Sequence, residues 1–171
     1  MEGTTLGGRY LLAEEIGFGG MGVVHRALDL RTGGAVAVKL PNPLLAHDPT
    51  FRERLRREAQ SAASLTSPRI VRVIDLDEHE GTPFLVMEYV PGDTLQDLLA
   101  NRGALPLRDA LNIGLEVARA LEAAHSHGVI HRDLKPQNIK LVDGQIKVLD
   151  FGIARMERLP GLTTASVFVG T

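Results

Sequence analysis

The sequence predicts an α+β protein in which a lobe rich in antiparallel strands is followed by a helical lobe. The first ninety residues hold short runs of β-branched and aliphatic residues separated by Gly, Pro, Asp and Thr, a pattern typical of strands. After Val90-Pro91-Gly92, apolar residues recur every three or four positions, which is the spacing of helices. We therefore expect one unit over residues 1–90, a second over 91–171 and a hinge between them.

The first lobe is expected to contain five strands and one helix. The strands are Tyr10–Glu15, Gly22–Leu28, Gly34–Leu40, Ile70–Asp77 and Phe84–Tyr89. The helix follows Asp48-Pro49, because these residues supply an N-cap side chain and a proline suited to the first turn. Its apolar residues at helical spacing are Phe51, Leu55, Ala59, Ala62 and Leu65.

The second lobe is expected to begin with a short helix over Leu95–Ala100 and a long one over about Leu107–His127. An apolar stripe recurs along the long helix, and Gly128 sits where a helix C-terminal glycine belongs. The stripe consists of Leu111, Leu115, Ala118, Leu121 and His125. Because clefts between domains are favoured ligand sites, the Val90 to Gly92 joint directs attention to the space between the lobes.

Composition excludes several classes of protein. With 44% hydrophobic and 23% charged residues, the chain resembles ordinary soluble globular proteins, and a formal charge of -2 predicts no nucleic-acid partner. The absence of cysteine excludes disulfides and thiolate metal sites and fits a reducing, cytoplasmic location. No apolar run approaches the about 20 residues that span a bilayer. An anchor beyond Thr171 in a longer parent protein stays open.

A glycine-rich segment lies between the first two expected strands and has the pattern G-x-G-x-x-G-x-V. Its residues, all candidates for nucleotide binding, are Ile16, Gly17, Phe18, Gly19, Gly20, Met21, Gly22 and Val24. Glycines let the backbone approach a polyphosphate and direct N–H groups at it. The alternatives are a plain hairpin turn and a dinucleotide-binding turn. The second needs a helix after the last glycine, whereas Val23–Ala27 looks like a strand, which favours a lid over phosphates.

Lys39 is the candidate cation of the first lobe. Side chains alternate along a strand, so Lys39 and Ala37 share a face and point to the cleft if Val36 and Val38 pack inward. Glu58 lies on the apolar face of the expected helix, and we expect it to pair with Lys39 and position the lysine for the α- and β-phosphates. The alternative is a solvated strand lysine.

Two motifs in the second lobe carry the strongest signal. The string His131-Arg132-Asp133-Leu134-Lys135-Pro136-Gln137-Asn138 is followed, twelve residues after Asn138, by Asp150-Phe151-Gly152. With these motifs the chain resembles the bacterial branch of the eukaryotic-like serine/threonine protein kinases. The resemblance covers the whole chain, because Tyr10, the Gly-Gly-Met-Gly loop and Gly170-Thr171 also stand in family order.

The resemblance implies a bilobal protein-kinase-like fold that transfers the γ-phosphate of ATP to serine or threonine hydroxyls of protein substrates. Asp133 would be the catalytic base, and Lys135 would neutralise the γ-phosphate and indicate serine/threonine specificity. Asn138 would assist catalysis and, with Asp150, supply oxygen ligands to Mg²⁺. Phosphoryl transfer asks little covalent chemistry of the protein, so positioning and charge neutralisation must supply most of the rate.

The adenine site is implied by the same resemblance. Val24 and Ala37 would cover the ring, and Met87 would be the gatekeeper. The backbones of Glu88 and Val90 would hydrogen-bond the adenine edge. Lys140 departs from the family, which usually has an apolar residue there; we expect its stem under the ring and its amine in water.

Regulation follows from the resemblance as well. Arg132 beside the catalytic aspartate is similar to kinases whose activation loop is ordered by phosphorylation, because a guanidinium pairs with phosphate in bidentate geometry. The candidate acceptors are Thr163, Thr164 and Ser166, with an exposed polar loop as the alternative. The resemblance also raises the option of a dimer that phosphorylates itself.

The end of the chain bears on activity. Family members continue beyond Gly170-Thr171 into further helices, so we expect a partial helical lobe with an exposed apolar patch. One alternative to an active kinase is a catalytically incomplete nucleotide-binding fragment or interaction module. Another, phosphorylation of a small molecule, is disfavoured by Lys135-Pro136 and Gly170-Thr171, which match the protein-kinase pattern.

Overall fold

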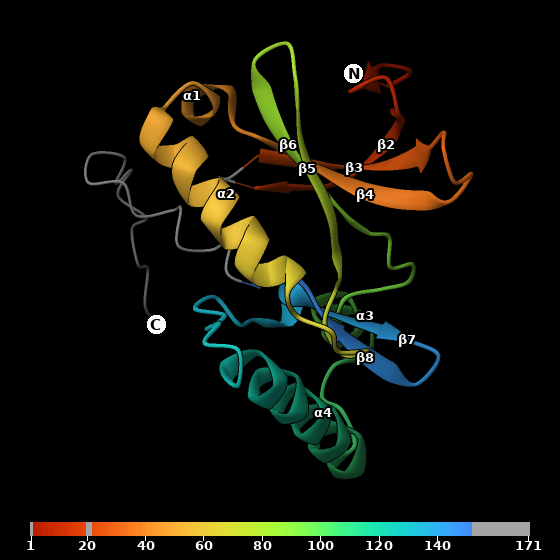
Figure 1. Ribbon diagram of the computed structural model, residues 1–171. Coiled ribbons are helices and arrows are strands. Elements are labelled where there is room, and N and C mark those ends of the chain that lie inside the picture. The colour runs from red at the N-terminus through yellow and green to blue at the C-terminus, as the bar shows by residue number, and fades with distance from the viewer. Residues whose placement is uncertain (1, 20–21, 152–171) are drawn as a thin grey trace, which may run out of the picture.

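A six-stranded antiparallel sheet dominates the first lobe of the computed structural model, which describes residues 2–19 and 22–151 (Figure 1). The strand order is β1-β2-β3-β4-β6-β5. The strands are β1 (Thr5–Leu6), β2 (Tyr10–Gly19), β3 (Gly22–Asp29), β4 (Ala35–Pro41), β5 (Val73–His79) and β6 (Thr82–Glu88). All five predicted strands are present, and β1 is an additional short edge strand.

Two helices, not the one predicted, lie between β4 and β5: α1 (Pro43–Ala46) and α2 (Pro49–Ala63). The one-turn helix α1 begins because the side chain of Asn42 accepts a hydrogen bond from Leu44 N. The helix α2 begins as predicted, since Asp48 Oδ1 accepts from the amides of Thr50 and Phe51. A four-residue helix is too short to show an apolar period, which explains why the sequence pattern missed it.

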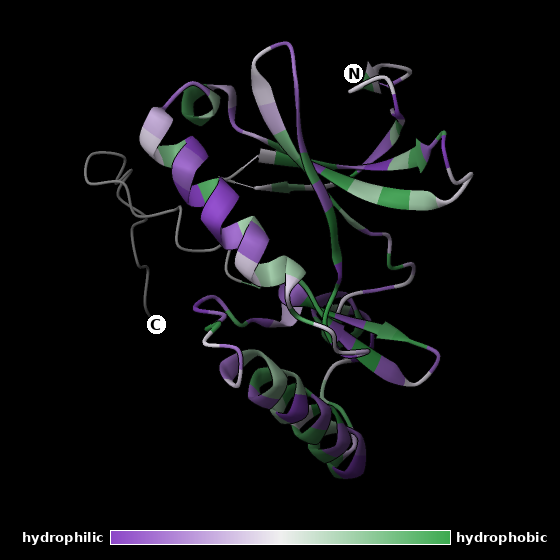
Figure 2. Cartoon of the chain, in the orientation of Figure 1, coloured by the Kyte–Doolittle hydropathy of each residue, from purple (hydrophilic) through white to green (hydrophobic). Residues whose placement is uncertain are grey.

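The helix α2 covers one side of the sheet, where its apolar face is buried. The buried residues are Phe51, Leu55, Ala59 and Ala62, as their spacing predicts, and they share a core with Leu85 and Met87 of β6. The rest of α2 is strongly hydrophilic (Figure 2). The sheet and α2 thus form two layers. Strands of the sheet border the cleft between the lobes.

A second core joins β2 to β6. The rings of Tyr10 and Phe84, both 0% exposed, meet edge to face with centroids 5.9 Å apart. At the rim of this core, Arg9 donates two hydrogen bonds to the carboxylate of Asp29, at 2.8 and 2.7 Å. This guanidinium holds the pKa of Asp29 well below its usual range. Tyr10 Oη also donates to Asp75, which ties β2 to β5.

The second lobe consists of helices and a small hairpin. Its elements are α3 (Leu95–Arg102), α4 (Leu107–His125), the 3₁₀ turn η1 (Pro136–Asn138), β7 (Ile139–Val142) and β8 (Gln145–Val148). Both helices were predicted, but the β7–β8 hairpin was not. Its signal was the Asp143-Gly144 dipeptide, whose residues have φ of 49° and 78° and form the tight turn that such pairs favour.

The helix α4 is turned so that small residues face the protein. Val117, Ala120 and Ala124 are buried and let the helix approach the hairpin closely, whereas Leu111 and Leu115 are exposed. The apolar stripe picked out in the sequence is therefore not the buried face of α4. Exposed Leu107, Leu111 and Leu115 together form the apolar patch that was expected on the second lobe.

The two lobes share backbone and core. After α2 the chain passes beside β8, where Val71 N donates to Val148 O at 2.9 Å and Val148 N donates to Arg69 O at 2.8 Å. Leu65 and Ile70 are buried in the core of the second lobe. The predicted unit 1–90 thus lends residues to the second core, which fixes the lobes in relation to each other.

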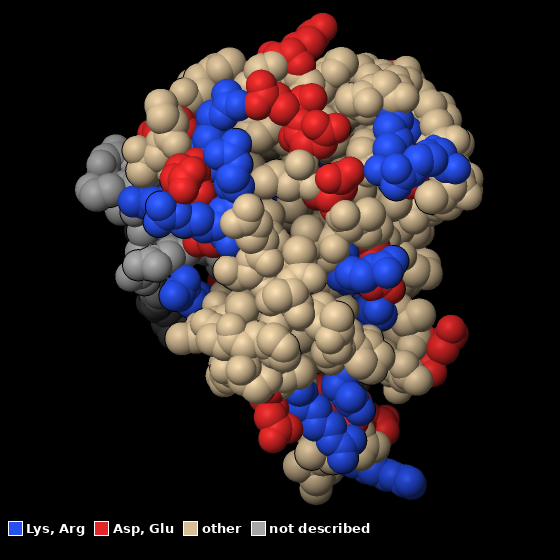
Figure 3. All heavy atoms as spheres, viewed as in Figure 1, with Lys and Arg blue, Asp and Glu red and all other residues tan. Residues whose placement is uncertain are grey.

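Charges of both signs are scattered over the face seen in Figure 3, in line with the formal net charge of -2. In the part of the chain that the structure describes, no helix has the length and apolar character needed to cross a membrane.

Replacing Phe84 by alanine should lower the free energy of unfolding by about 3–5 kcal/mol, because it empties a fully buried ring site. Chemical denaturation measures the change. The matched control is Phe18→Ala, since Phe18 is 81% exposed and its loss should cost within about 0.5 kcal/mol. Equal effects of the two substitutions would contradict the described core.

Candidate functional site

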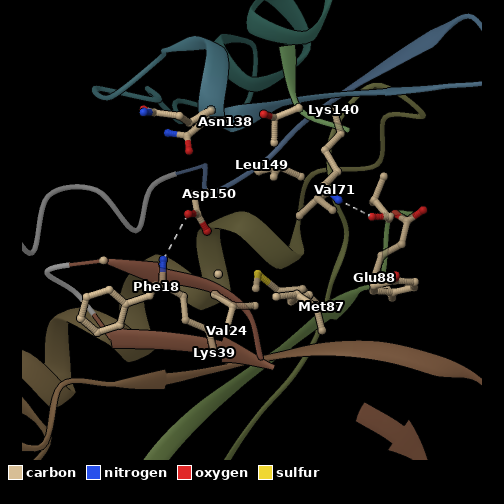
Figure 4. A pocket seen from close by; sticks show the side chains of 18 of the residues that line it. Phe18, Val24, Lys39, Val71, Met87, Glu88, Asn138, Lys140, Leu149 and Asp150 are labelled. Atoms are coloured by element: carbon tan, nitrogen blue, oxygen red, sulfur yellow. Dashed lines mark hydrogen bonds and ion pairs between the residues drawn. The ribbon is translucent and has the colours of Figure 1, made fainter. Parts of the chain in front are cut away.

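A cavity of about 510 Å³ lies between the lobes and gathers the candidate residues. The strands β2, β3, β4 and β6 line it from the first lobe, and the segment from Asp133 to Lys140 lines it from the second (Figure 4). Leu149 and Asp150 close its inner end. The volume suits a nucleotide-sized ligand.

The glycine-rich segment is a β-hairpin, in which Gly17, Phe18 and Gly19 pair with Val24, Val23 and Gly22. Since β3 follows the last glycine directly, the dinucleotide-binding alternative is wrong. Six of the predicted residues line the cavity: Ile16, Gly17, Phe18, Gly19, Gly22 and Val24. Gly20 and Met21 lie outside the described residues.

Gly22 is a position that admits only glycine. Its φ is 139°, and a Cβ atom there would lie 1.9 Å from the carbonyl oxygen of Leu40. The start of β3 therefore lies very close to the backbone of β4. This contact fixes β3 relative to the strand that carries Lys39.

Lys39 points into the cavity, as the strand alternation predicts. Val38 is 0% exposed in the core of the lobe, while Ala37 and Lys39 line the cavity on the other face of β4. The ammonium of Lys39 lies 3.2 Å from Asp150 Oδ2 (Figure 4). An ion pair thus crosses the cleft between two lobes.

The predicted pairing of Lys39 with Glu58 stays a prediction, and Glu58 does not line the cavity. The carboxylate that reaches Lys39 belongs to Asp150, whose left-handed backbone (φ 55°) aims its side chain at β4. Glu58 nevertheless lies on α2 with its Oε2 atom buried, on the side of the helix that faces the protein.

Asp133 is held by two neighbours in the loop that ends in η1. Asn138 Nδ2 donates to the backbone oxygen of Asp133 at 2.8 Å and to its carboxylate at 3.3 Å. The ammonium of Lys135 lies 2.7 Å from Asp133 Oδ2. All three residues line the cavity, as predicted, and the carboxylate is oriented by the amide and neutralised by the lysine.

His131 supports this loop from behind and is 2% exposed. Asp133 N donates to its Nδ1 at 3.3 Å, so the opposite nitrogen carries the proton and donates to Leu149 O at 2.7 Å. Its ring also packs edge to face on Phe151, with centroids 4.7 Å apart. One side chain therefore connects the Asp133 loop to the segment that bears Asp150.

Arg132 has φ of 67°, an unusual backbone for a side-chain-bearing residue, and its side chain is exposed. Its proposed role in binding a phosphorylated loop stays a prediction. Gly152 and the candidate acceptors Thr163, Thr164 and Ser166 lie outside the described residues.

The opposite end of the cavity is largely apolar. The predicted Met87, Glu88 and Val90 line it. Over the whole cavity, sequence reasoning missed five lining residues: Val71, Tyr89, Thr94, Gln137 and Leu149. Leu149 could have been found, because it directly precedes Asp150. The carboxylate of Glu88 is held by Lys147 Nζ at 2.6 and 2.7 Å, so its charge is neutralised beside the hinge.

Lys140 lines this end, but its amine is not directed at water as expected. The ammonium donates to the carbonyl oxygens of Val90, at 2.9 Å, and Gly92, at 2.8 Å (Figure 4). Burial lowers the pKa of Lys140, an effect opposed by the nearby carboxylates of Asp97 and Asp93. The two backbone acceptors satisfy an ammonium that the apolar surroundings desolvate.

A site for a divalent cation is compatible with Asn138 and Asp150. No group of three or more His, Cys, Asp or Glu within the described residues could hold a metal ion by itself. Mg²⁺ usually takes one or two protein oxygens and completes its shell with water and substrate phosphates, so two donors beside a phosphate-sized space fit it.

A model of the protein kinase domain matches residues 10–171. The chain belongs to the protein kinase family. Among its relatives, a probable serine/threonine-protein kinase of Streptomyces coelicolor is 49% identical over 97% of this chain. The serine/threonine-protein kinase PknB of Mycolicibacterium smegmatis is 46% identical over 97%. The chain spans 26% and 28% of the length of these two relatives.

Solved structures confirm the bilobal fold. The PknI kinase domain of Mycobacterium tuberculosis superposes with a TM-score of 0.80 at 36% identity, over 90% of this chain and 61% of that one. The structure of Rad53 in complex with AMP-PNP gives a TM-score of 0.74 at 32% identity, over 85% of this chain and 38% of the other.

Replacing His131 by alanine should lower the free energy of unfolding of the kinase domain by about 1–3 kcal/mol, because Leu149 O and Asp133 N lose a buried partner. Urea denaturation measures the change. His125→Ala is the control, since His125 is exposed and its loss should cost within about 0.5 kcal/mol. A His131 variant as stable as the control would show that this bridge is not needed.

Proposed function

We propose that this kinase domain transfers the γ-phosphate of Mg-ATP to serine and threonine hydroxyls of proteins, with Asp133 as catalytic base. The observation that carries the proposal is the arrangement of Lys39, Asp133, Asn138 and Asp150 around one cavity, although Lys39 and Asp150 are 111 residues apart. The first lobe, about residues 1–90, would hold the nucleotide, and the second would supply the catalytic loop.

The nucleotide would lie along the length of the cavity. The glycine-rich hairpin would cover the phosphates, and Val24, Ala37 and Met87 would enclose the base. The backbone of Glu88 and Val90 would bind the edge of the adenine. The AMP-PNP complex of Rad53, a structure of the same fold, supports a nucleotide in this cleft.

At the phosphate end of the cavity, cations would neutralise the negative charge of the nucleotide. Mg²⁺, held by Asn138 and Asp150, would supply positive charge to the β- and γ-phosphate oxygens. Lys39 pairs with Asp150 at 3.2 Å and stands within reach of the same space, so it would turn to the α- and β-phosphates when the nucleotide is bound. Lys135 would neutralise the γ-phosphate.

The transfer itself needs one base and good alignment. The substrate hydroxyl oxygen forms a bond to the γ-phosphorus while the bond from that phosphorus to the bridging oxygen breaks, which leaves ADP. Asp133 orients the hydroxyl and accepts its proton. Asn138 keeps the Asp133 backbone and carboxylate in place through bonds of 2.8 and 3.3 Å. Self-phosphorylation within a dimer stays a prediction.

The test measures nucleotide binding and turnover separately. We expect Mg-ATP to raise the melting temperature of the wild-type chain and γ-labelled ATP to label serine or threonine. Lys39→Met should reduce the thermal shift, because the phosphates lose a cation. Asp133→Asn should keep the shift but lower labelling by about 10²–10⁴-fold, the usual effect of removing a general base.

Asp143→Asn is the matched control, because Asp143 is an exposed carboxylate in the β7–β8 turn and does not line the cavity. It should label as the wild type does. A thermal shift without any labelling would support the alternative of an incomplete nucleotide-binding module, and labelling that survives Asp133→Asn would overturn the assignment of the base.

A further inference from the structure

The adenine end of the cavity carries a charged residue on its floor. Lys140 belongs to β7 and pairs across an isolated bridge with Thr94, which also lines the cavity. Its aliphatic stem crosses the floor and its ammonium reaches the hinge, where it donates to the carbonyls of Val90 and Gly92. An aliphatic residue at this place would leave both carbonyls without this donor.

The hinge is pressed tightly against β7, so the ammonium has a fixed location. Leu141 N donates to Asp93 O at 3.2 Å. A Cβ atom on Gly92, which has φ of 89°, would lie 3.0 Å from the carbonyl oxygen of Leu141. With close backbone contacts at Gly92 and at Asp93, the distance between β7 and the hinge is set independently of Lys140. The lysine therefore fills a gap of constant size with a positive charge.

We propose that Lys140 determines nucleobase specificity: its ammonium occupies the carbonyl acceptor of Val90 and thereby selects adenine over purines that carry an amino group at C2. The inference rests on the proposed binding of ATP in this cleft.

The chemistry of the adenine edge leads to this selection. If Val90 N–H donates to N1 and the carbonyl of Glu88 accepts from the 6-amino group, then C2, the neighbour of N1, faces the carbonyl of Val90. Adenine has only a C–H group at this position and needs no acceptor. A 2-amino group is a donor, and the carbonyl that it would face already accepts from the Lys140 ammonium, so its N–H groups would point at a positive charge.

A purely structural role of Lys140 would change the nucleotide affinities in a different way. If Lys140 only held the hinge in place, its removal would weaken all nucleotides by the same factor. A specificity-determining role changes the ratio of affinities between two ligands that differ only at C2. The ratio of the two affinities therefore tests the inference, whereas the absolute affinity for one nucleotide does not.

The experiment measures the dissociation constants of ATP and 2-amino-ATP by calorimetry for the wild type, Lys140→Met and Lys147→Met. In the wild type, 2-amino-ATP should bind about tenfold more weakly than ATP, since its 2-amino N–H groups face the positive charge of the Lys140 ammonium. In Lys140→Met, whose side chain keeps a similar length without the charge, the two constants should agree to within about twofold.

Lys147→Met is the control, because Lys147 also holds an ammonium beside the hinge, on the carboxylate of Glu88, but does not line the cavity. It should keep the wild-type ratio. An unchanged ratio in Lys140→Met overturns the inference alone. A wild type that binds no ATP overturns the proposed function and the inference together. Melting curves verify that Lys140→Met is folded, and Lys140→Leu replaces it if it is not.

Discussion

Each acidic side chain at the phosphate end of the cleft is paired with a lysine, and the rest of the site depends on these two pairs. Asp150 meets Lys39 at 3.2 Å, and Asp133 meets Lys135 at 2.7 Å. Two free carboxylates would repel a polyphosphate, whereas unit charges 4 Å apart attract by about 4 kcal/mol at intermediate dielectric, with part of that lost to desolvation. The pairs therefore serve to position charge, and in the proposed function Mg-ATP would replace partners within them.

The β7–β8 hairpin explains how the second lobe delivers both candidate metal ligands to one place. β7 begins directly after Asn138, and β8 ends shortly before Asp150. The two ends are joined by a hydrogen bond of 2.8 Å from Leu149 N to Asn138 O. The same hairpin carries Lys140, whose ammonium donates to the carbonyls of Val90 and Gly92, and Lys147, which pairs with Glu88. The adenine end and the phosphate end of the cleft are thus built on one element.

Local patterns predicted most of the site, and contacts between distant segments account for what they missed. The spacing of the glycines, the alternation around Lys39 and the string from His131 to Asn138 each contain residues that line the cavity. The partner of Lys39 could not be read from spacing, because it depends on where Asp150 lies in the fold. The buried face of α4 was misjudged because leucine predicts burial only where a neighbour covers it, and small residues allow the closest packing. For Lys140, the direction of the amine depended on two backbone carbonyls that no side-chain pattern records.

In the proposed function, the acidic side chains of the cleft need a cation before the nucleotide can bind. The most direct test is the dissociation constant of ATP, with and without Mg²⁺, in the wild type and in Asp150→Asn. Removing Mg²⁺ should weaken ATP binding strongly in the wild type. In Asp150→Asn, ATP without metal should bind more tightly than in the metal-free wild type, because a repelling charge is gone, while added Mg²⁺ should have little effect. An equal dependence on Mg²⁺ in both proteins would contradict the account.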